Sequence, residues 1–348
     1  MVLLAGLLSA FAALVALEIS LRAVATWLPM NIANTLLGRY NDWAPGGIFF
    51  YDETPGLSFM RPNHETTTFC SGYFWRHQTD EWGFRNRPGV AKEILLLGDS
   101  MIYGHGVDLE HTAAEILRTE YGHPVYNMSR TADCLYQHYM LLRMFAERWK
   151  PKQAVLFVLV NDPQDVYVYR PGPALLTRPE LTHYDYKGPF ERMQARGKDP
   201  PRQFYQWSML SFTRRLYVGW QQGWGVPTAE LFPQAEDQSR RITPYWVFAV
   251  EQPGIFGPVT GYFRAVVTHL ARFLGDRGVE LRMVWLDTRD AAPGLDRVHD
   301  MVGAMVAQIC EENGLVCDST LSEFSNCQDC YLAGDGHYTP KGNRRLAR

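Results

Sequence analysis

Apolar runs of strand length alternate with helix-length segments along most of the chain from residue 93 onward. The first run, residues 94–97, is apolar at every position, which suits a strand buried on both faces of a parallel sheet. Strands are predicted at residues 94–97, 124–128, 154–160, 280–286 and 315–318, and helices at 112–121, 134–149, 261–274 and 295–312. Strands joined by such helices form βαβ units with right-handed crossovers. The sequence therefore predicts an α/β fold with five parallel strands around one core.

The alternation is interrupted between residues 163 and 258, where Pro, Gly and aromatic residues accumulate. A structureless loop of that length is uncommon, so the insertion is expected to fold, with a helix through residues 207–220, and to lie over the carboxyl edge of the sheet. Its aromatic side chains suit a lid or a binding wall for sugars or acyl chains. A small aromatic core or a protein-docking surface is an equally good interpretation.

The N-terminal segment is almost entirely apolar from residue 2 to residue 29, interrupted by Glu18 and Arg22. About 20 apolar residues are enough for a helix to span a bilayer. Glu18 and Arg22 are four residues apart and can pair on one helix face, with Trp27 as an interfacial aromatic anchor. No Lys or Arg precedes the apolar stretch, which favours an uncleaved anchor over a cleaved signal peptide, and a buried core helix is a weaker alternative.

Residues 30–92 are rich in Gly, Pro, Asn and aromatic residues, and this segment is interpreted as a strand-poor collar between the membrane and the first core strand. The expected organisation is a transmembrane anchor at 1–29, the collar at 30–92 and an α/β domain at 93–348 that contains the insertion at 163–258. A net charge of -3 with scattered Lys and Arg gives no support for nucleic-acid binding.

The six cysteines bear on the compartment in which the chain works: Cys70, Cys134, Cys310, Cys317, Cys327 and Cys330. An even count in a membrane-anchored, exported chain indicates disulfides. A four-cysteine zinc site made from the last four is disfavoured, because their spacing is not a matched pair of C-x-x-C knuckles. The residue after Cys330 is Tyr331 rather than His, which excludes c-type haem attachment there.

Ser100 emerges directly after the first core strand, where Gly98 lets the chain bend. Open α/β sheets bind ligands at this edge, so Ser100 is a candidate nucleophile, although a helix cap by Asp99 or Ser100 explains the same residues. A serine nucleophile needs a base and a partner that orients the base. Asp335 and His337 offer both from one Gly-containing loop, the alternative being an incidental surface turn.

Donors for a developing oxyanion are available on the same edge of the predicted sheet. The backbone amides of Ser100 and Ala132 and the side chain of Asn161 all follow core strands, so they converge at one edge. Loss of one such donor costs about 3 kcal/mol of transition-state stabilisation. Asn161 alone is equally compatible with a turn-forming role.

Four segments together resemble the sequence blocks of the SGNH (GDSL) hydrolases: Gly98-Asp99-Ser100, Asn127 to Ala132, Asn161-Asp162 and Asp335-Gly336-His337. The resemblance implies a flavodoxin-like three-layer sandwich and serine esterase, lipase or carbohydrate acyltransferase activity without metal or cofactor. It implies that Ser100 is the nucleophile, His337 the base, Asp335 its orienter, and Ser100, Ala132 and Asn161 the oxyanion hole. The two-residue spacing from Asp335 to His337 is similar to that of membrane-associated alginate acetyltransferases.

Two hypotheses follow for function. The first is a membrane-anchored extracytoplasmic enzyme that removes or transfers a short acyl group, such as acetyl, on an envelope glycan or another acyl ester. The second is an SGNH-like domain that serves as a non-catalytic subunit docked on integral-membrane partner proteins. Both place residues 1–29 in the lipid bilayer and the α/β domain in the periplasm or elsewhere outside the cytoplasmic membrane.

Overall fold

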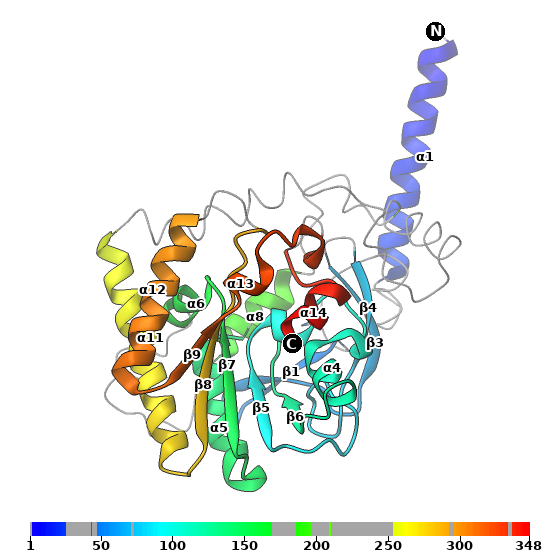
Figure 1. Cartoon of the computed structure of the whole chain (residues 1–348). Coiled ribbons are helices and arrows are strands. Elements are labelled where there is room, and N and C mark those ends of the chain that lie inside the picture. Colours follow the sequence, from blue (N-terminus) through cyan, green and yellow to red (C-terminus); the bar gives the residue numbers. More distant parts are fainter. Residues whose placement is uncertain are drawn as a thin grey trace.

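A five-stranded parallel sheet forms the centre of the molecule in the computed structural model, which describes residues 2–25, 43, 47–70, 73–131, 133–168, 186–196, 209, 253–291, 296–332 and 336–348 (Figure 1). Its strands are β5 (Ile94–Leu97), β6 (Val125–Asn127), β7 (Gln153–Val158), β8 (Glu280–Trp285) and β9 (Val316–Ser319). They pair in the order β6-β5-β7-β8-β9, all parallel. This is the flavodoxin-like order, so the predicted fold class is confirmed.

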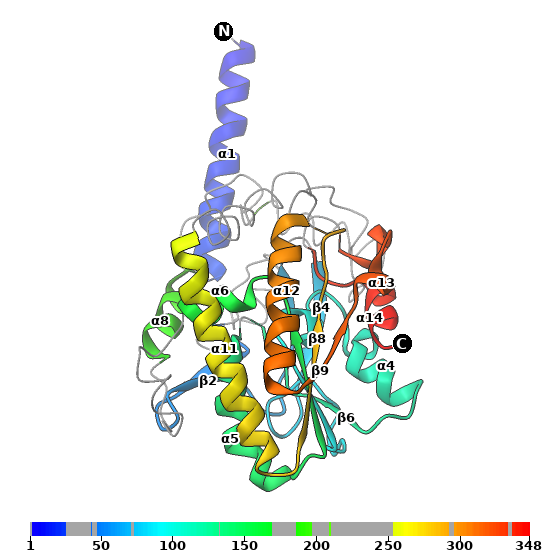
Figure 2. The same cartoon turned by 60° about the vertical axis from the view of Figure 1, so that its left-hand side comes forward.

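Helices cover both faces of the sheet and complete a three-layer sandwich (Figures 1 and 2). One layer contains α5 (Leu135–Trp149), α11 (Pro253–Gly275) and α12 (Asp296–Asn313), and the other contains α4 (Ala113–Thr119) and α14 (Pro340–Leu346). The shorter helical elements are α3 (Ser100–Tyr103), α6 (Asp162–Val168), α8 (Lys187–Arg196), α13 (Leu321–Phe324), η1 (Leu109–His111) and η3 (Gln328–Cys330). The central strand β5 is buried between the layers: Leu95 and Leu97, which point to one face, are inaccessible to solvent, and Leu96, which points to the other, is 3% exposed.

The collar between residues 30 and 92 contains four strands, so the prediction of a strand-poor segment is wrong. β1 (Phe49–Asp52) pairs with β2 (Leu57–Met60), and β3 (Glu65–Cys70) pairs with β4 (Tyr73–Gln78), both antiparallel. The glycines and prolines that indicated irregular structure lie outside these strands. Apolar residues of the first hairpin join the main core, which makes the collar part of the α/β domain's packing rather than a linker.

The described part of the insertion packs against the collar. α8 presents Phe190, which contacts Trp43 at a ring-centroid distance of 5.6 Å and Tyr51 at 5.7 Å. Tyr186, just before α8, is buried and lies 6.5 Å from Trp43. Trp43, Tyr186 and Phe190 belong to the main hydrophobic core, so this part of the insertion packs into the domain together with the collar. The helix expected at 207–220 lies outside the described residues apart from Met209.

Helix α11 begins at Pro253, earlier than the predicted start at 261, so its first turn lies within the segment that was predicted to be the insertion. Pro at a first helical position is tolerated because its missing N–H has no intrahelical acceptor there. A second proline, Pro258, lies inside the helix. Because proline disfavours a helix interior, local propensity did not predict the first turns of α11. Burial of Val259, Phe263 and Val266 in the domain offsets that cost.

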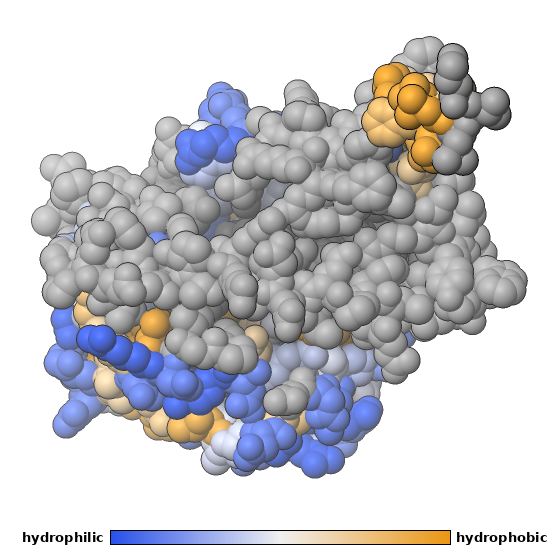
Figure 3. Space-filling model, turned by 90° about the horizontal axis from the view of Figure 1, so that it is seen from above, coloured by the Kyte–Doolittle hydropathy of each residue, from blue (hydrophilic) through white to orange (hydrophobic). Residues whose placement is uncertain are grey.

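Helix α1 (Val2–Ala25) projects away from the sandwich (Figure 1). Its segment Leu4–Leu21 has a mean hydropathy of 2.1, and only 6% of that segment is buried. Seen from above, its apolar side chains form a patch at one corner of the molecule (Figure 3). Glu18 is the buried exception and accepts a hydrogen bond from the Met209 amide at 2.8 Å. The side chain of Arg22 and the whole of Trp27 lie outside the described residues, so the Glu18–Arg22 pair stays a prediction. By length and composition, α1 fits a membrane span or a signal sequence.

Two disulfides join cysteines that are close in the sequence. Cys310–Cys317 links the end of α12 to β9, and Cys327–Cys330 closes the segment around η3. Cys134 is free and buried. The side chain of Cys70 lies outside the described residues. The four cysteines considered for a zinc site are thus paired with one another as disulfides.

Candidate active site

Ser100 and His337 meet at the carboxyl edge of the sheet, although they are 237 residues apart in the sequence. Ser100 is the first residue of α3, directly after β5, and His337 follows the last strand in the loop before α14. The Nε2 atom of His337 lies 2.7 Å from the Oγ atom of Ser100. Both residues are partly accessible to solvent. A hydroxyl hydrogen-bonded to an imidazole nitrogen at this distance is the arrangement that proton transfer requires.

The turn that presents Ser100 depends on its two preceding residues. A Cβ on Gly98 would lie 2.6 Å from Ile102 Cγ1, so only glycine lets α3 fold back this closely on β5. The Asp99 side chain accepts a hydrogen bond from the Met101 amide at 2.9 Å and caps α3. Capping is therefore done by Asp99, while the Ser100 hydroxyl contacts His337.

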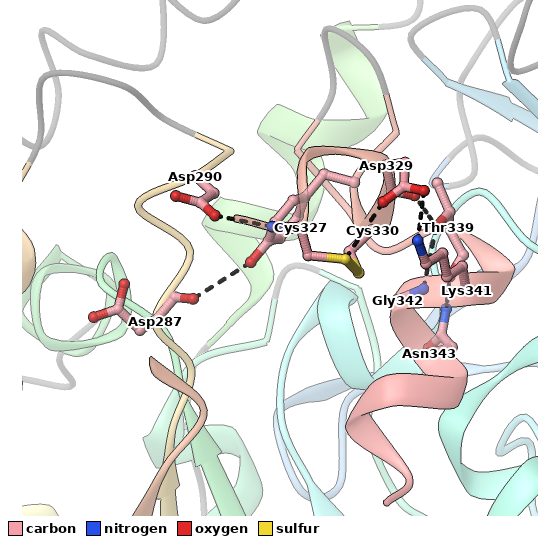
Figure 4. The surroundings of a disulfide bond; sticks show 10 residues. Asp287, Asp290, Cys327, Asp329, Cys330, Thr339, Lys341, Gly342 and Asn343 are labelled. Carbon is pink, nitrogen blue, oxygen red and sulfur yellow. Dashed lines mark hydrogen bonds and ion pairs between the residues drawn. A yellow bond between two sulfur atoms is a disulfide. The ribbon is translucent and has the colours of Figure 1, made fainter. Parts of the chain in front are cut away.

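The loop that carries His337 is held at its base by backbone hydrogen bonds. Leu332 donates to the His337 carbonyl at 2.6 Å, and Thr339 donates to the Cys330 carbonyl at 2.9 Å. The Cys327–Cys330 disulfide lies beside this base, and the Asp329 carboxylate accepts from Lys341 Nζ at 2.5 Å (Figure 4). The disulfide and α14 thus fix both ends of the segment from which His337 reaches Ser100.

Replacing Cys327 and Cys330 together by Ser is expected to lower the free energy of unfolding by about 2 kcal/mol, the loop-entropy value for so short a loop. It is also expected to slow modification of Ser100 by a fluorophosphonate, because the base of the His337 loop loosens. The matched control is the double variant Cys310→Ser, Cys317→Ser. Its disulfide joins the end of α12 to β9 and is not part of the His337 loop. Urea unfolding and labelling kinetics measure the two effects. Equal labelling rates in both double variants would contradict a role for this disulfide at the site.

Three other residues expected at the site have different outcomes. Asp335 and Ala132 lie outside the described residues. Asn161 is partly buried at the end of the β7 segment, and its Nδ2 atom donates to Asp165 Oδ2 at 2.7 Å. An amide nitrogen carries two donors, so one N–H of Asn161 is engaged by α6 and the second can serve a ligand. The described structure thus joins Ser100 to His337 and directs Asn161 partly into the fold.

Carboxyl groups are buried beneath Ser100. Burial raises the pKa of Asp99, whereas the Met101 amide and the nearby His337 oppose that rise. Burial also raises the pKa of Asp162 well above its usual range, and the neighbouring Asp99 adds to this effect. Asp99 therefore caps α3 and is also a buried carboxyl group whose charge interacts with that of His337.

The second sequence block is fixed by a buried ion pair. Arg130 donates to both carboxylate oxygens of Asp133, at 2.7 and 2.8 Å, and also to the carbonyl of Ser58 in β2. Both charged side chains are about fully buried, with 1% exposure each. His138 packs against the pair, with Nδ1 3.7 Å from Asp133 Oδ2. The collar therefore helps to hold Arg130 and, through it, Asp133.

His138 makes the stability of the protein sensitive to acid. Burial, with a smaller contribution from Arg130, lowers the pKa of His138 to about 3. Between this value and the usual 6.5 the unfolded chain binds a proton that the folded protein does not. The stabilisation is thus complete above pH 6.5 and is lost as pH falls toward 3.

At pH 5, protonation of the unfolded chain at His138 is expected to cost about 2 kcal/mol of stability. The His138→Phe variant should therefore lose about 2 kcal/mol less than the wild type between pH 7 and pH 5. Urea unfolding at both pH values measures this difference. His123→Gln, at an exposed position, is the control and should follow the wild type. An identical pH dependence in wild type and His138→Phe would contradict the assignment.

A histidine that the sequence analysis did not single out also lies at the site. The ring of His105 stacks on that of His337 with a centroid distance of 4.2 Å and an interplanar angle of 25°. The signal available in the sequence was its position between Gly104 and Gly106, shortly after the serine. Glycines on both sides indicate a turn, but they do not reveal which side chain the turn presents.

No protein-family model and no curated protein sequence matches the chain. Among solved structures, TesA is 12% identical, with a TM-score of 0.39, and the match covers 74% of this chain and 94% of TesA. The psychrotrophic esterase EstA from Pseudoalteromonas sp. is 9% identical, with a TM-score of 0.37 and coverage of 74% and 94%. A catalytic mutant of Axe2, an acetylxylan esterase from Geobacillus stearothermophilus, is 12% identical, with a TM-score of 0.37 and coverage of 74% and 92%. These likenesses are too distant to carry an argument about the reaction.

Proposed function

We propose that the chain is a serine hydrolase or acyltransferase of the SGNH type, acting on short acyl esters through an acyl-serine intermediate. The observation that carries the proposal is the 2.7 Å contact between His337 Nε2 and Ser100 Oγ at the carboxyl edge of a flavodoxin-like sheet. Serine becomes a useful nucleophile only when such a base takes its proton. No metal or cofactor is needed for this chemistry.

In the proposed reaction, Ser100 Oγ bonds to the ester carbonyl carbon as its proton moves to His337 Nε2. The bond from that carbon to the alcohol oxygen then breaks, and the leaving alcohol takes the proton from His337. Water or a sugar hydroxyl, deprotonated in turn by His337, attacks the acyl group and releases Ser100. Asp335 would orient His337, and the amides of Ser100 and Ala132 with Asn161 would stabilise the oxyanion.

We further propose that α1 anchors the enzyme in a membrane, with the α/β domain outside the cytoplasmic membrane and an envelope glycan as the acylated substrate. The exposed apolar side chains of α1 support the anchor. The two disulfides support an oxidising compartment. The proposed enzyme therefore acts at the membrane surface, on substrates that reach the carboxyl edge of the sheet.

The test uses the full chain in detergent micelles. A fluorophosphonate probe is expected to modify Ser100, identified by peptide mass spectrometry, and the protein is expected to release acetate from an O-acetylated glycan or p-nitrophenyl acetate. Absence of both labelling and ester release in folded protein would overturn the proposal.

The second candidate is a non-catalytic subunit docked on an integral-membrane protein. The observation in its favour is that Asn161, one of the expected oxyanion donors, has its amide nitrogen engaged by Asp165. Folded chain that co-purifies with a membrane protein and leaves the probe unreacted would support this candidate. Labelling confined to Ser100 would count against it.

A further inference from the structure

We propose that His105 is a positioning residue that holds the His337 imidazole in the plane from which Nε2 reaches Ser100. This inference rests on the proposed function and extends it to a residue outside the expected triad. His105 is 5% exposed, and its ring lies against His337 on one side, with centroids 4.2 Å apart. On another side it contacts the buried Trp75 of β4, with centroids 4.4 Å apart. His105 thus connects the collar to the base.

The backbone places His105 relative to the serine itself. The His105 amide donates to the Ser100 carbonyl at 3.0 Å, so the two residues share one turn at the end of α3. Gly104 closes that turn with a φ of +84°, and a Cβ there would lie 2.5 Å from Thr112 Cγ2. Only glycine satisfies both conditions. The turn therefore presents the His105 ring at a fixed position relative to Ser100.

A buried arginine of the collar, Arg85, holds the same turn through hydrogen bonds to its backbone carbonyls. Arg85 Nη1 donates to the carbonyls of Gly104 at 2.5 Å and Tyr103 at 3.2 Å, and Nη2 donates to Val107 at 2.5 Å. These carbonyls lie on both sides of His105 in the sequence. The guanidinium also lies over the Tyr103 ring, 4.8 Å from its centroid. The collar therefore fixes the position of the ring that contacts the base.

A face-to-face contact suits this role because it restrains the tilt of the His337 ring and leaves the ring edge to Ser100. The hydrogen bonds along the His337 loop act on its backbone, whereas the His105 ring acts on the His337 side chain itself. A misplacement of about 1 Å in a reacting group can cost about 100-fold in rate. Loss of the His105 ring is therefore expected to act through the Ser100–His337 geometry rather than through substrate contacts.

The experiment compares fluorophosphonate labelling of Ser100 in full-length wild type, His105→Ala, His105→Phe and His299→Ala in detergent micelles. His299 is a fully buried histidine on α12 that contacts Trp285, and it serves as the matched control for cavity formation. His105→Ala should label roughly 100-fold more slowly, and His105→Phe, which keeps a flat ring, should recover to within about 5-fold of wild type. His299→Ala should label like wild type. On a chromogenic ester, His105→Ala should lower kcat and leave KM within about 2-fold.

Two results would overturn the positioning role: wild-type labelling by His105→Ala, or equal slowing of His105→Ala and His299→Ala in proportion to lost stability. Histidine-selective NMR supplies a readout that needs no reactive serine. The His337 ring protons should show contacts to His105 in wild type and to the phenyl ring in His105→Phe, and their shifts should change in His105→Ala. If wild-type Ser100 does not label, the proposed function fails, while unchanged His337 resonances in His105→Ala would separately refute the stack.

Discussion

Replacing Ser100 by Ala is expected to lower the rate of ester hydrolysis on the order of 10⁴-fold or more, and His337→Gln is expected to lower it by a similar factor. The rate of ester hydrolysis in the double variant should lie within a few-fold of the rate in the slower single variant. The reason is that the 2.7 Å contact makes the two side chains one unit, so that removing either one removes proton transfer. Initial rates on a chromogenic acetate ester, with the full chain in micelles, measure all three effects.

Ser325→Ala is the control for these variants, because Ser325 is exposed after α13 and its hydroxyl donates to the nearby Leu321 carbonyl at 2.6 Å. Thermal unfolding should give the same midpoint for all four proteins. If the Ser100 and His337 effects multiply in the double variant, the two residues act independently, and the nucleophile and base assignments are wrong.

The centre of the sheet could be predicted from the sequence because β5 and most of β7 are buried on both faces and so are apolar along their length. Residues 94–97 are the clearest example, since β5 occupies those four positions. Strands β3 and β4 of the collar escaped prediction because their pattern is set by pairing with each other. Glu65 faces Gln78, and Thr66 faces His77 across β3 and β4, so polar residues are frequent on both strands. Such a hairpin is recognised only when its partner is known.

Topology also brought Ser100 and His337 to one edge, because parallel strands end on the same side of a sheet. Their contact is found in the structure, whereas the roles of Asp335 and Ala132 remain predictions. The stacking of the His105 ring on the His337 ring could not be predicted from the sequence. It depends on the left-handed conformation of Gly104 and on the position of Arg85, and both are consequences of three-dimensional packing.

Arg85 has an unusual environment for a charged side chain. It is fully buried, and the hydrogen bonds of its terminal nitrogens go to backbone carbonyls, those of Tyr103, Gly104 and Val107 and, at 3.1 Å, that of Arg76. Burial lowers the pKa of the guanidinium. A buried carbonyl that loses its donor costs about 1–3 kcal/mol, and several lose theirs at once when Arg85 is changed. The planar guanidinium can donate hydrogen bonds to carbonyls of two separate chain segments at once, which a single ammonium group cannot do with the same geometry.

Arg85→Lys is therefore expected to lower the free energy of unfolding by about 3–5 kcal/mol and to slow Ser100 labelling in the molecules that remain folded. Arg87→Lys is the matched control two residues away, because the Arg87 side chain is 60% exposed. Its buried partner Glu115 also pairs with Arg118, so the change should cost less than about 1 kcal/mol. Urea unfolding measures the free energy of unfolding. The rate of Ser100 labelling, measured without urea and well below the thermal unfolding midpoint, reports the geometry of the site. Slow labelling in folded Arg85→Lys links the collar to the base through His105. Wild-type labelling in an equally destabilised protein would restrict Arg85 to holding the fold, because the turn would then keep His105 in place without the guanidinium.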